Sequence, residues 1–195
     1  MRMRAAALGA AILMGVTACS GADADTDAGS KPSTSAVPSS ATPSRTPSAP
    51  AAPIKLGEAF AWGDAARSQA TGTTTVLSYE QPAKGSNPPG EGLGVEDAVW
   101  ATVEVKVCNA QGPDITTDQQ PWSLAFPDGA RVQVTGLNGG DLPKPEFPTM
   151  PTVIKAGDCV RGKIPFPVPK DQRPSKIIYA PMSAPSPVEW AVPTA

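Results

Sequence analysis

The residues of this chain that could carry out chemistry are three cysteines, scattered acidic side chains and serine–lysine combinations. None of them has an imidazole partner, because the 195 residues contain no histidine. Ser-His-Asp and Cys-His nucleophile systems need histidine as their base, and His-containing zinc sites need it as a ligand. These site types are therefore excluded, and only Ser/Lys chemistry or a pair of carboxylates stays open.

The acidic side chains that could form a catalytic pair are Glu91, Glu96 and Asp97. They lie in a Gly- and Pro-rich stretch, where solvated loop charges are the simpler interpretation. Copper delivery needs soft ligands, and Met150 and Met182 are the only methionines beyond the N-terminal segment. We therefore expect no enzymatic activity, no metal and no cofactor.

The N-terminal segment has the layout of an export signal. Two arginines precede an apolar run over residues 5–16, and polar residues follow it. A transmembrane helix needs about 20 apolar residues, so the run is too short to span a bilayer. This order of charged, apolar and small residues is typical of a cleaved signal peptide.

Residues Val16-Thr17-Ala18-Cys19 resemble the bacterial lipobox. In that motif the cysteine thiol is lipidated and the chain is cleaved on its amino side. The resemblance implies that residues 1–18 are removed and that Cys19 carries a diacylglyceryl anchor, whose two chains suffice for stable attachment. The alternative is a free surface thiol after an ordinary cleavage site. We expect a protein anchored in the cell membrane and facing the extracellular side.

Residues 19–53 predict a disordered linker. Beyond the cysteine they are mostly Ser, Thr, Ala, Pro, Gly and Asp, with no aromatic residue. Such a composition cannot bury enough apolar surface to offset the entropy of ordering. The linker would reach roughly 30 Å as a flexible coil and about 100 Å as extended polyproline. Residues 54–195 are long enough for a single folded domain.

Cys108 and Cys159 remain as an even pair in an exported, oxidising setting, which predicts a disulfide. Two unpaired thiols are the alternative. Cys108 shares the parity of Glu104 in its predicted strand, and Cys159 shares that of Arg161. Both sulfurs are therefore expected to point away from the core, joining neighbouring strands on an outer face.

In the predicted folded part, apolar residues recur at every second position, which is the period of a β-strand. Valines at 99, 103, 105 and 107 alternate with polar residues, as in a half-buried strand. The candidate strands are residues 56–62, 73–79, 99–107, 121–126, 131–135, 159–168, 176–179 and 188–192. Seven to eight short strands separated by turn residues predict an all-β, immunoglobulin-like antiparallel β-sandwich. Prolines at 165, 167 and 169 remove donors from one side of their strand, which places it at a sheet edge.

Residues 103–109, 124–129, 156–168 and 177–179 together resemble an uncharacterised family of Ig-like domains in Gram-positive lipoproteins. That family is similar to the mycobacterial immunoprotective extracellular antigen. The resemblance implies an Ig-like fold without an assigned activity, so it assigns no functional residue. This chain departs from the family in its long loops, its extra prolines and its cysteine pair.

Two aromatic residues are candidates for interaction. Trp100 lies on the polar side of its strand. Either another segment covers it, such as the one carrying Trp190, or it is an exposed anchor of the kind found at interfaces. Phe147 lies near the end of a long loop, residues 136–151, and a second long loop spans residues 81–97. Loops of this length are usually functional or disordered.

The two loops are expected to emerge at opposite ends of the sandwich. An odd number of predicted strands separates them, and this places them apart if each strand crosses the sandwich once. They would then not form one shared surface.

Charge excludes one class of partner. Lysine and arginine total 16 against 18 acidic residues, which offers no electrostatic footprint for nucleic acid. We expect a lipid-anchored, extracytoplasmic Ig-like binding or interaction module whose partner is an envelope protein or a cell-wall component. The alternatives are a wall-acting hydrolase that uses carboxylates and a purely structural envelope spacer.

Overall fold

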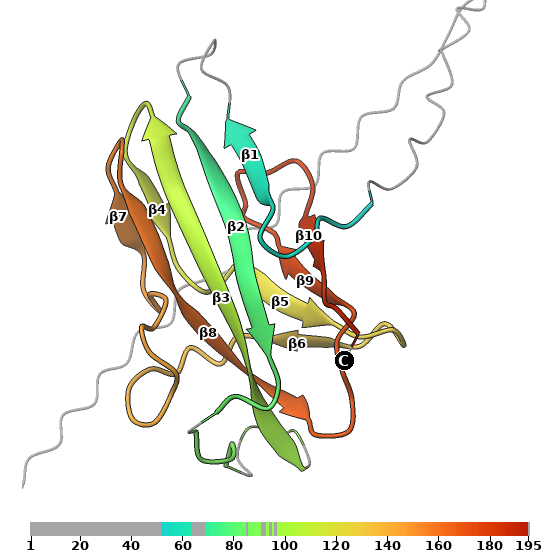
Figure 1. Cartoon of the computed structure of the whole chain (residues 1–195). Helices are drawn as coiled ribbons and strands as arrows, with labels where there is room; N and C mark the ends of the chain where they lie inside the picture. The colour runs from blue at the N-terminus through green and yellow to red at the C-terminus, as the bar shows by residue number, and fades with distance from the viewer. Residues whose placement is uncertain are drawn as a thin grey trace, which may run out of the picture. The chain divides into compact units, whose positions relative to one another are not determined.

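The structure is a computed structural model that describes residues 52–63, 69–84, 86–90, 93, 95 and 97–194. The predicted signal peptide, the lipobox cysteine and nearly all of the predicted linker lie outside the described residues. The described part is all-β and contains ten strands (Figure 1). None of its elements is a helix that is long and apolar enough to cross a membrane.

Eight strands form two four-stranded antiparallel sheets that share one core, which is the expected Ig-like β-sandwich. The first sheet has the order β1 (Ala59–Gly63), β2 (Thr71–Glu80), β3 (Ala98–Gln111) and β8 (Cys159–Pro169). The second has the order β10 (Val188–Ala191), β9 (Lys176–Tyr179), β5 (Trp122–Ala125) and β6 (Arg131–Gln133). Each of the eight overlaps a strand expected from the sequence.

Two further strands were not expected. β4 (Ile115–Thr117) pairs antiparallel with β7 (Thr152–Ile154) in a separate two-stranded sheet. The sequence pattern missed them because three residues are too few to display an alternation of apolar and polar side chains. The strand count is therefore ten rather than seven to eight.

The core lies between the two large sheets and is filled by alternate residues of each strand. From the first sheet, Val103, Val105 and Ile164 are each fully buried. From the second, the Trp122 ring lies 4.5 Å from that of Tyr179 and 6.0 Å from that of Trp190. The aromatic residues thus fill the space between the sheets.

The cysteine pair lies on the outer face of the first sheet. The register places Cys108 directly opposite Cys159, with their Cα atoms 4.0 Å apart and their sulfurs bonded. Glu104 lies on the same face of β3 and accepts a hydrogen bond from Arg161 Nε (2.8 Å). Because core residues occupy the alternate positions, the disulfide joins neighbouring strands from outside rather than bridging the two sheets.

The free edge of β8 is depleted of hydrogen-bond donors. Lys163 N donates away from β3, to Pro145 O (2.8 Å), so the odd-numbered residues of β8 direct their backbone groups outward. Pro165, Pro167 and Pro169 share that parity. The predicted edge position is confirmed, and the missing N–H groups protect this edge from pairing with other strands.

Removal of the disulfide should destabilise the domain without changing its fold. The bond closes a loop of 51 residues. By lowering the conformational entropy of the unfolded chain, such a bond stabilises the folded state by about 4 kcal/mol. We expect the Cys108→Ser/Cys159→Ser variant to lose about that free energy of unfolding in urea titrations. Reductant should lower the free energy of unfolding of the wild type to that of the variant and should leave the stability of the variant unchanged. Equal stability of variant and wild type would contradict this assignment.

Candidate functional site

A short segment, residues 145–147, lies against the outer edge of β8. Lys163 N donates to Pro145 O (2.8 Å), and Phe147 N donates to Lys163 O (3.0 Å). A Cβ atom at Gly162 would lie 2.4 Å from Phe147 N and 2.5 Å from Glu146 C, which are backbone atoms, so the whole segment would have to shift to make room. Glycine at this position is therefore what lets the segment approach so closely.

Phe147 belongs to the core and is not an exposed contact. Its side chain is 1% exposed, and its carbonyl accepts a hydrogen bond from the buried Gln119 Nε2 (2.8 Å). The expectation of an interaction residue in the loop is wrong for this position. The hydrogen bonds between residues 145–147 and β8 place the Phe147 ring in the core. The sequence of the loop does not reveal this pairing, because β8 follows it at a distance in the chain.

Trp100 is also covered, at 7% exposure, so it is not an exposed anchor. Ala83, itself 8% exposed, donates from its backbone to Trp100 O (2.7 Å). The buried Pro167 lies opposite Trp100 in the sheet. Trp190 is not the cover, because it packs in the core beside Trp122. The chain that follows β2 is therefore hydrogen-bonded to the backbone of β3 at Trp100.

The two long loops meet, contrary to the expectation from strand counting. Ser86 Oγ donates to Asp141 O (3.1 Å), and Asn87 Nδ2 donates to Asp141 Oδ2. The counting failed because the chain does not cross the sandwich once per strand. After β6 it runs beside β8 to reach β7, so residues 136–151 lie along one side of the sandwich (Figure 1).

Glu146 organises the loop from within. Gly139 N donates to both of its carboxylate oxygens (2.8 and 3.1 Å), and Lys144 Nζ donates to Oε1. Burial opposes ionisation of Glu146, but the hydrogen bonds from Lys144 and Gly139 outweigh it and lower the pKa of the carboxyl. The side chain is therefore an ionised carboxylate that ties both ends of the turn together.

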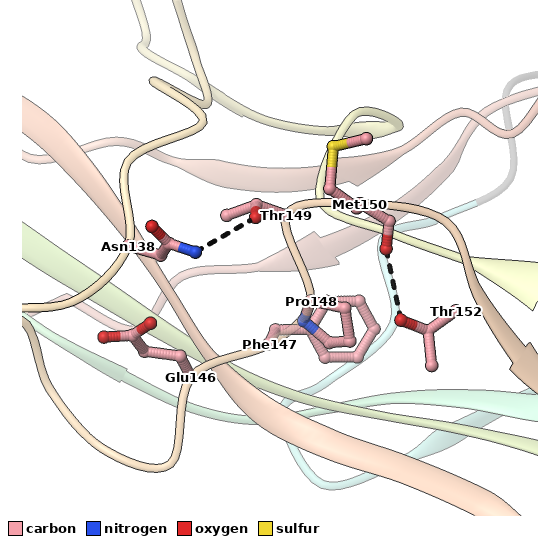
Figure 2. A pocket seen from close by; sticks show the side chains of 7 residues that line it. All are labelled: Asn138, Glu146, Phe147, Pro148, Thr149, Met150 and Thr152. Atoms are coloured by element: carbon pink, nitrogen blue, oxygen red, sulfur yellow. Dashed lines mark hydrogen bonds between the residues drawn. The ribbon is translucent and has the colours of Figure 1, made fainter.

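A shallow pocket of about 290 Å³ opens beside this carboxylate (Figure 2). Its lining residues are Asn138, Glu146, Phe147, Pro148, Thr149, Met150 and Thr152. Asn138 Nδ2 donates to Thr149 Oγ1 (3.4 Å), which joins the two sides of the loop across the pocket. The walls thus offer an amide, a carboxylate and hydroxyl groups within one small hollow.

One exposed apolar side chain, Met150, lines the pocket, and two others are neighbours of lining residues in the chain. The large hydrophobic residues that are exposed in the described part of the chain are Leu137 (45%), Met150 (72%), Val153 (57%) and Met182 (105%). All but Met182 line the pocket or adjoin a residue that does. We call residues 86–87, 137–150 and 152–153 the loop surface. Sequence reasoning missed Leu137 and Met150 as site residues, although apolar residues inside a turn-rich stretch were a usable signal.

The carboxylates expected as alternatives do not form a described site. Glu91 and Glu96 lie outside the described residues. Asp97 is exposed and pairs with Lys170, with Oδ2 and Nζ 2.9 Å apart. Within the described residues, no group of three or more cysteine, aspartate or glutamate side chains is placed to hold a metal ion.

The solved structures that are similar to the chain include two bacterial proteins. One is MPT63, a secreted protein from Mycobacterium tuberculosis, with 18% identity and a TM-score of 0.53; the match covers 73% of this chain and 100% of MPT63. The other is the yjhA protein from Bacillus subtilis, with 15% identity and a TM-score of 0.50; the match covers 72% of this chain and 99% of that protein. At these identities the likeness shows the β fold alone. No protein-family model matches the sequence, and no curated protein matches it.

The Glu146→Gln variant should loosen the loop while leaving the sandwich folded. A carboxyl group whose pKa is lower in the folded than in the unfolded protein stabilises the folded state at pH values above its unfolded pKa. That stabilisation is lost as the pH falls through the pKa of the folded state. We expect the Gly139 amide of the wild type to stay protected from hydrogen exchange until the pH falls below the ordinary pKa of glutamate. In Glu146→Gln the protection should be low at every pH. Equal protection in both proteins would contradict the role of Glu146.

Proposed function

We propose that the chain is a lipid-anchored, extracellular Ig-like binding module that contacts an envelope protein or a cell-wall component through the loop surface. The observation that carries this proposal is the meeting of two long loops at Asp141, together with a pocket in the second loop that is lined in part by the exposed Met150. Ig-like sandwiches place their variable chemistry in loops, on a scaffold that stays fixed.

The composition of the loop surface favours a binding role. Soluble domains rarely group exposed apolar side chains unless the group meets a partner. Met150 supplies apolar contact area beside polar groups that can fix orientation, and Leu137 and Val153 add exposed apolar area next to lining residues in the chain. A hollow of about 290 Å³ is at the small end of the range for ligand pockets. It suits one side chain or one sugar unit of a larger partner.

The electrostatics of Glu146 favour binding over carboxylate hydrolysis. A general acid at neutral pH needs a raised pKa, whereas the pKa of Glu146 is lowered by its hydrogen bonds despite its burial. Its two oxygens are also occupied by Gly139 and Lys144. The carboxylate in the pocket is thus held as a structural and contact group.

The proposal of a lipid anchor is based on the lipobox sequence that ends at Cys19. We expect Cys19→Ala to release the protein into the medium or to leave an unprocessed precursor, because the thiol is the point of lipidation. Phase partitioning in detergent and mass measurement distinguish these outcomes. A variant that stays membrane-bound with the mature mass of the wild type would show that the anchor assignment is wrong.

The binding role is tested by a photoreactive side chain in place of Met150, activated on intact cells. We expect covalent adducts with a discrete envelope component. Adding Leu137→Asp should reduce their yield about fivefold or more, as expected for loss of an apolar contact at an interface. The matched control carries the photoreactive group at Met182, which is more exposed than Met150 (105% against 72%) but lies outside the loop surface.

The same adducts at Met150 and Met182, in equal yield, would contradict recognition by the loop surface. Hydrolysis of purified cell wall by the protein would favour the enzyme alternative instead.

A further inference from the structure

The two large sheets have four edges, and three of them are blocked. Prolines and residues 145–147 cover the edge of β8. Ile54 covers β10, donating to Glu189 O and accepting from Ala191 N (2.8 Å each). β6 is only three residues long and exposes Arg131 and Gln133. Short strands, charges and prolines are the usual means of preventing strands from pairing at an edge.

The edge of β1 lacks these features. Its sequence, AFAWG, has no charge and no proline. Within the described residues, no backbone group outside β2 is hydrogen-bonded to it. β1 also forms the rim of the first sheet, opposite to β8 (Figure 1). The unpaired N–H and C=O groups of an open edge are matched by another extended strand.

The side chains of β1 are self-complementary. Ala59, Ala61 and Gly63 are exposed and small, while Phe60 and Trp62 face the core and are half-buried. Antiparallel pairing of β1 with β1 of a second copy, centred on Ala61, matches all five residues. It places each Phe60 opposite a Trp62, which makes two aromatic cross-strand pairs.

We propose that a second copy of this chain binds at β1, joining two four-stranded sheets into one of eight strands. The absence of charge in β1 means that self-pairing brings no like charges together. β1 and β8 are opposite edges of the same sheet, so this dimer leaves both loop surfaces free. Two sites on one particle would raise the avidity for a repetitive envelope partner. The proposal stands on β1 alone and does not depend on the proposed binding role.

Cross-linking tests the register. We expect Ala61→Cys in the full-length, membrane-bound protein to form a covalent dimer under non-reducing conditions, because directly opposed residues of paired strands are close enough to bond. Gln133→Cys, at the exposed edge of β6, is the matched control and should stay uncross-linked. Absence of the dimer, or a cross-link from position 61 to a different protein, would overturn the proposal.

Charge exchange provides a second readout that does not rely on disulfide formation. Ala61 is exposed, so Ala61→Lys should fold normally but weaken self-association about fivefold by opposing like charges across the pair. Mixing it with Ala61→Glu should restore association, and Gln133→Lys should have no effect. A wild type that sediments as a monomer, or an equal effect of the two lysine variants, would contradict dimerisation through β1.

Discussion

The antiparallel pairing of β3 with β8 is the interaction on which the rest of the molecule depends. It runs without a register shift from Ala98 opposite Pro169 to Cys108 opposite Cys159. Because side chains alternate between faces, this single register decides which residues enter the core and places the two sulfurs opposite each other outside it. A slip by one residue would turn the valines of β3 toward solvent.

The same register also positions the loop surface. It turns the backbone of Lys163 outward, where residues 145–147 bind, and it places Gly162 at the closest approach. Glu146 then closes the turn through Gly139 and Lys144. Asp141 accepts the contact from the other loop. Backbone hydrogen bonds to β8 thus hold in place the loop that carries the exposed side chains of the proposed binding surface.

Much of the sandwich could be predicted because its long strands repeat. In β3 the alternation of valines with polar residues defines the core face, and the parity of Cys108 and Cys159 then places the disulfide. The alternating prolines of β8 identify an edge for the same reason. These features depend only on local geometry with a period of two.

The site could not be predicted because it depends on contacts between distant segments. Nothing near Trp100 in the sequence shows that its side chain is buried or that Ala83 is hydrogen-bonded to its backbone. Phe147 is buried by pairing with a strand that follows it in the chain. The short strands β4 and β7 carry no alternating pattern, so the sequence does not show the path of the chain between β6 and β8. Counting strands therefore places the two loops at opposite ends, although they touch.

Hydrogen–deuterium exchange on Gly162→Ala tests most directly whether the β3–β8 register supports the loop surface. The new Cβ atom would displace residues 145–147, since the nearest backbone atom is 2.4 Å away. We expect faster exchange at the amides of Phe147, Lys163 and Gly139, which donate the bonds that hold the segment and its turn, with β3 still protected. Unchanged exchange at these three amides would contradict the account, because the loop surface would then form without the contact at Gly162.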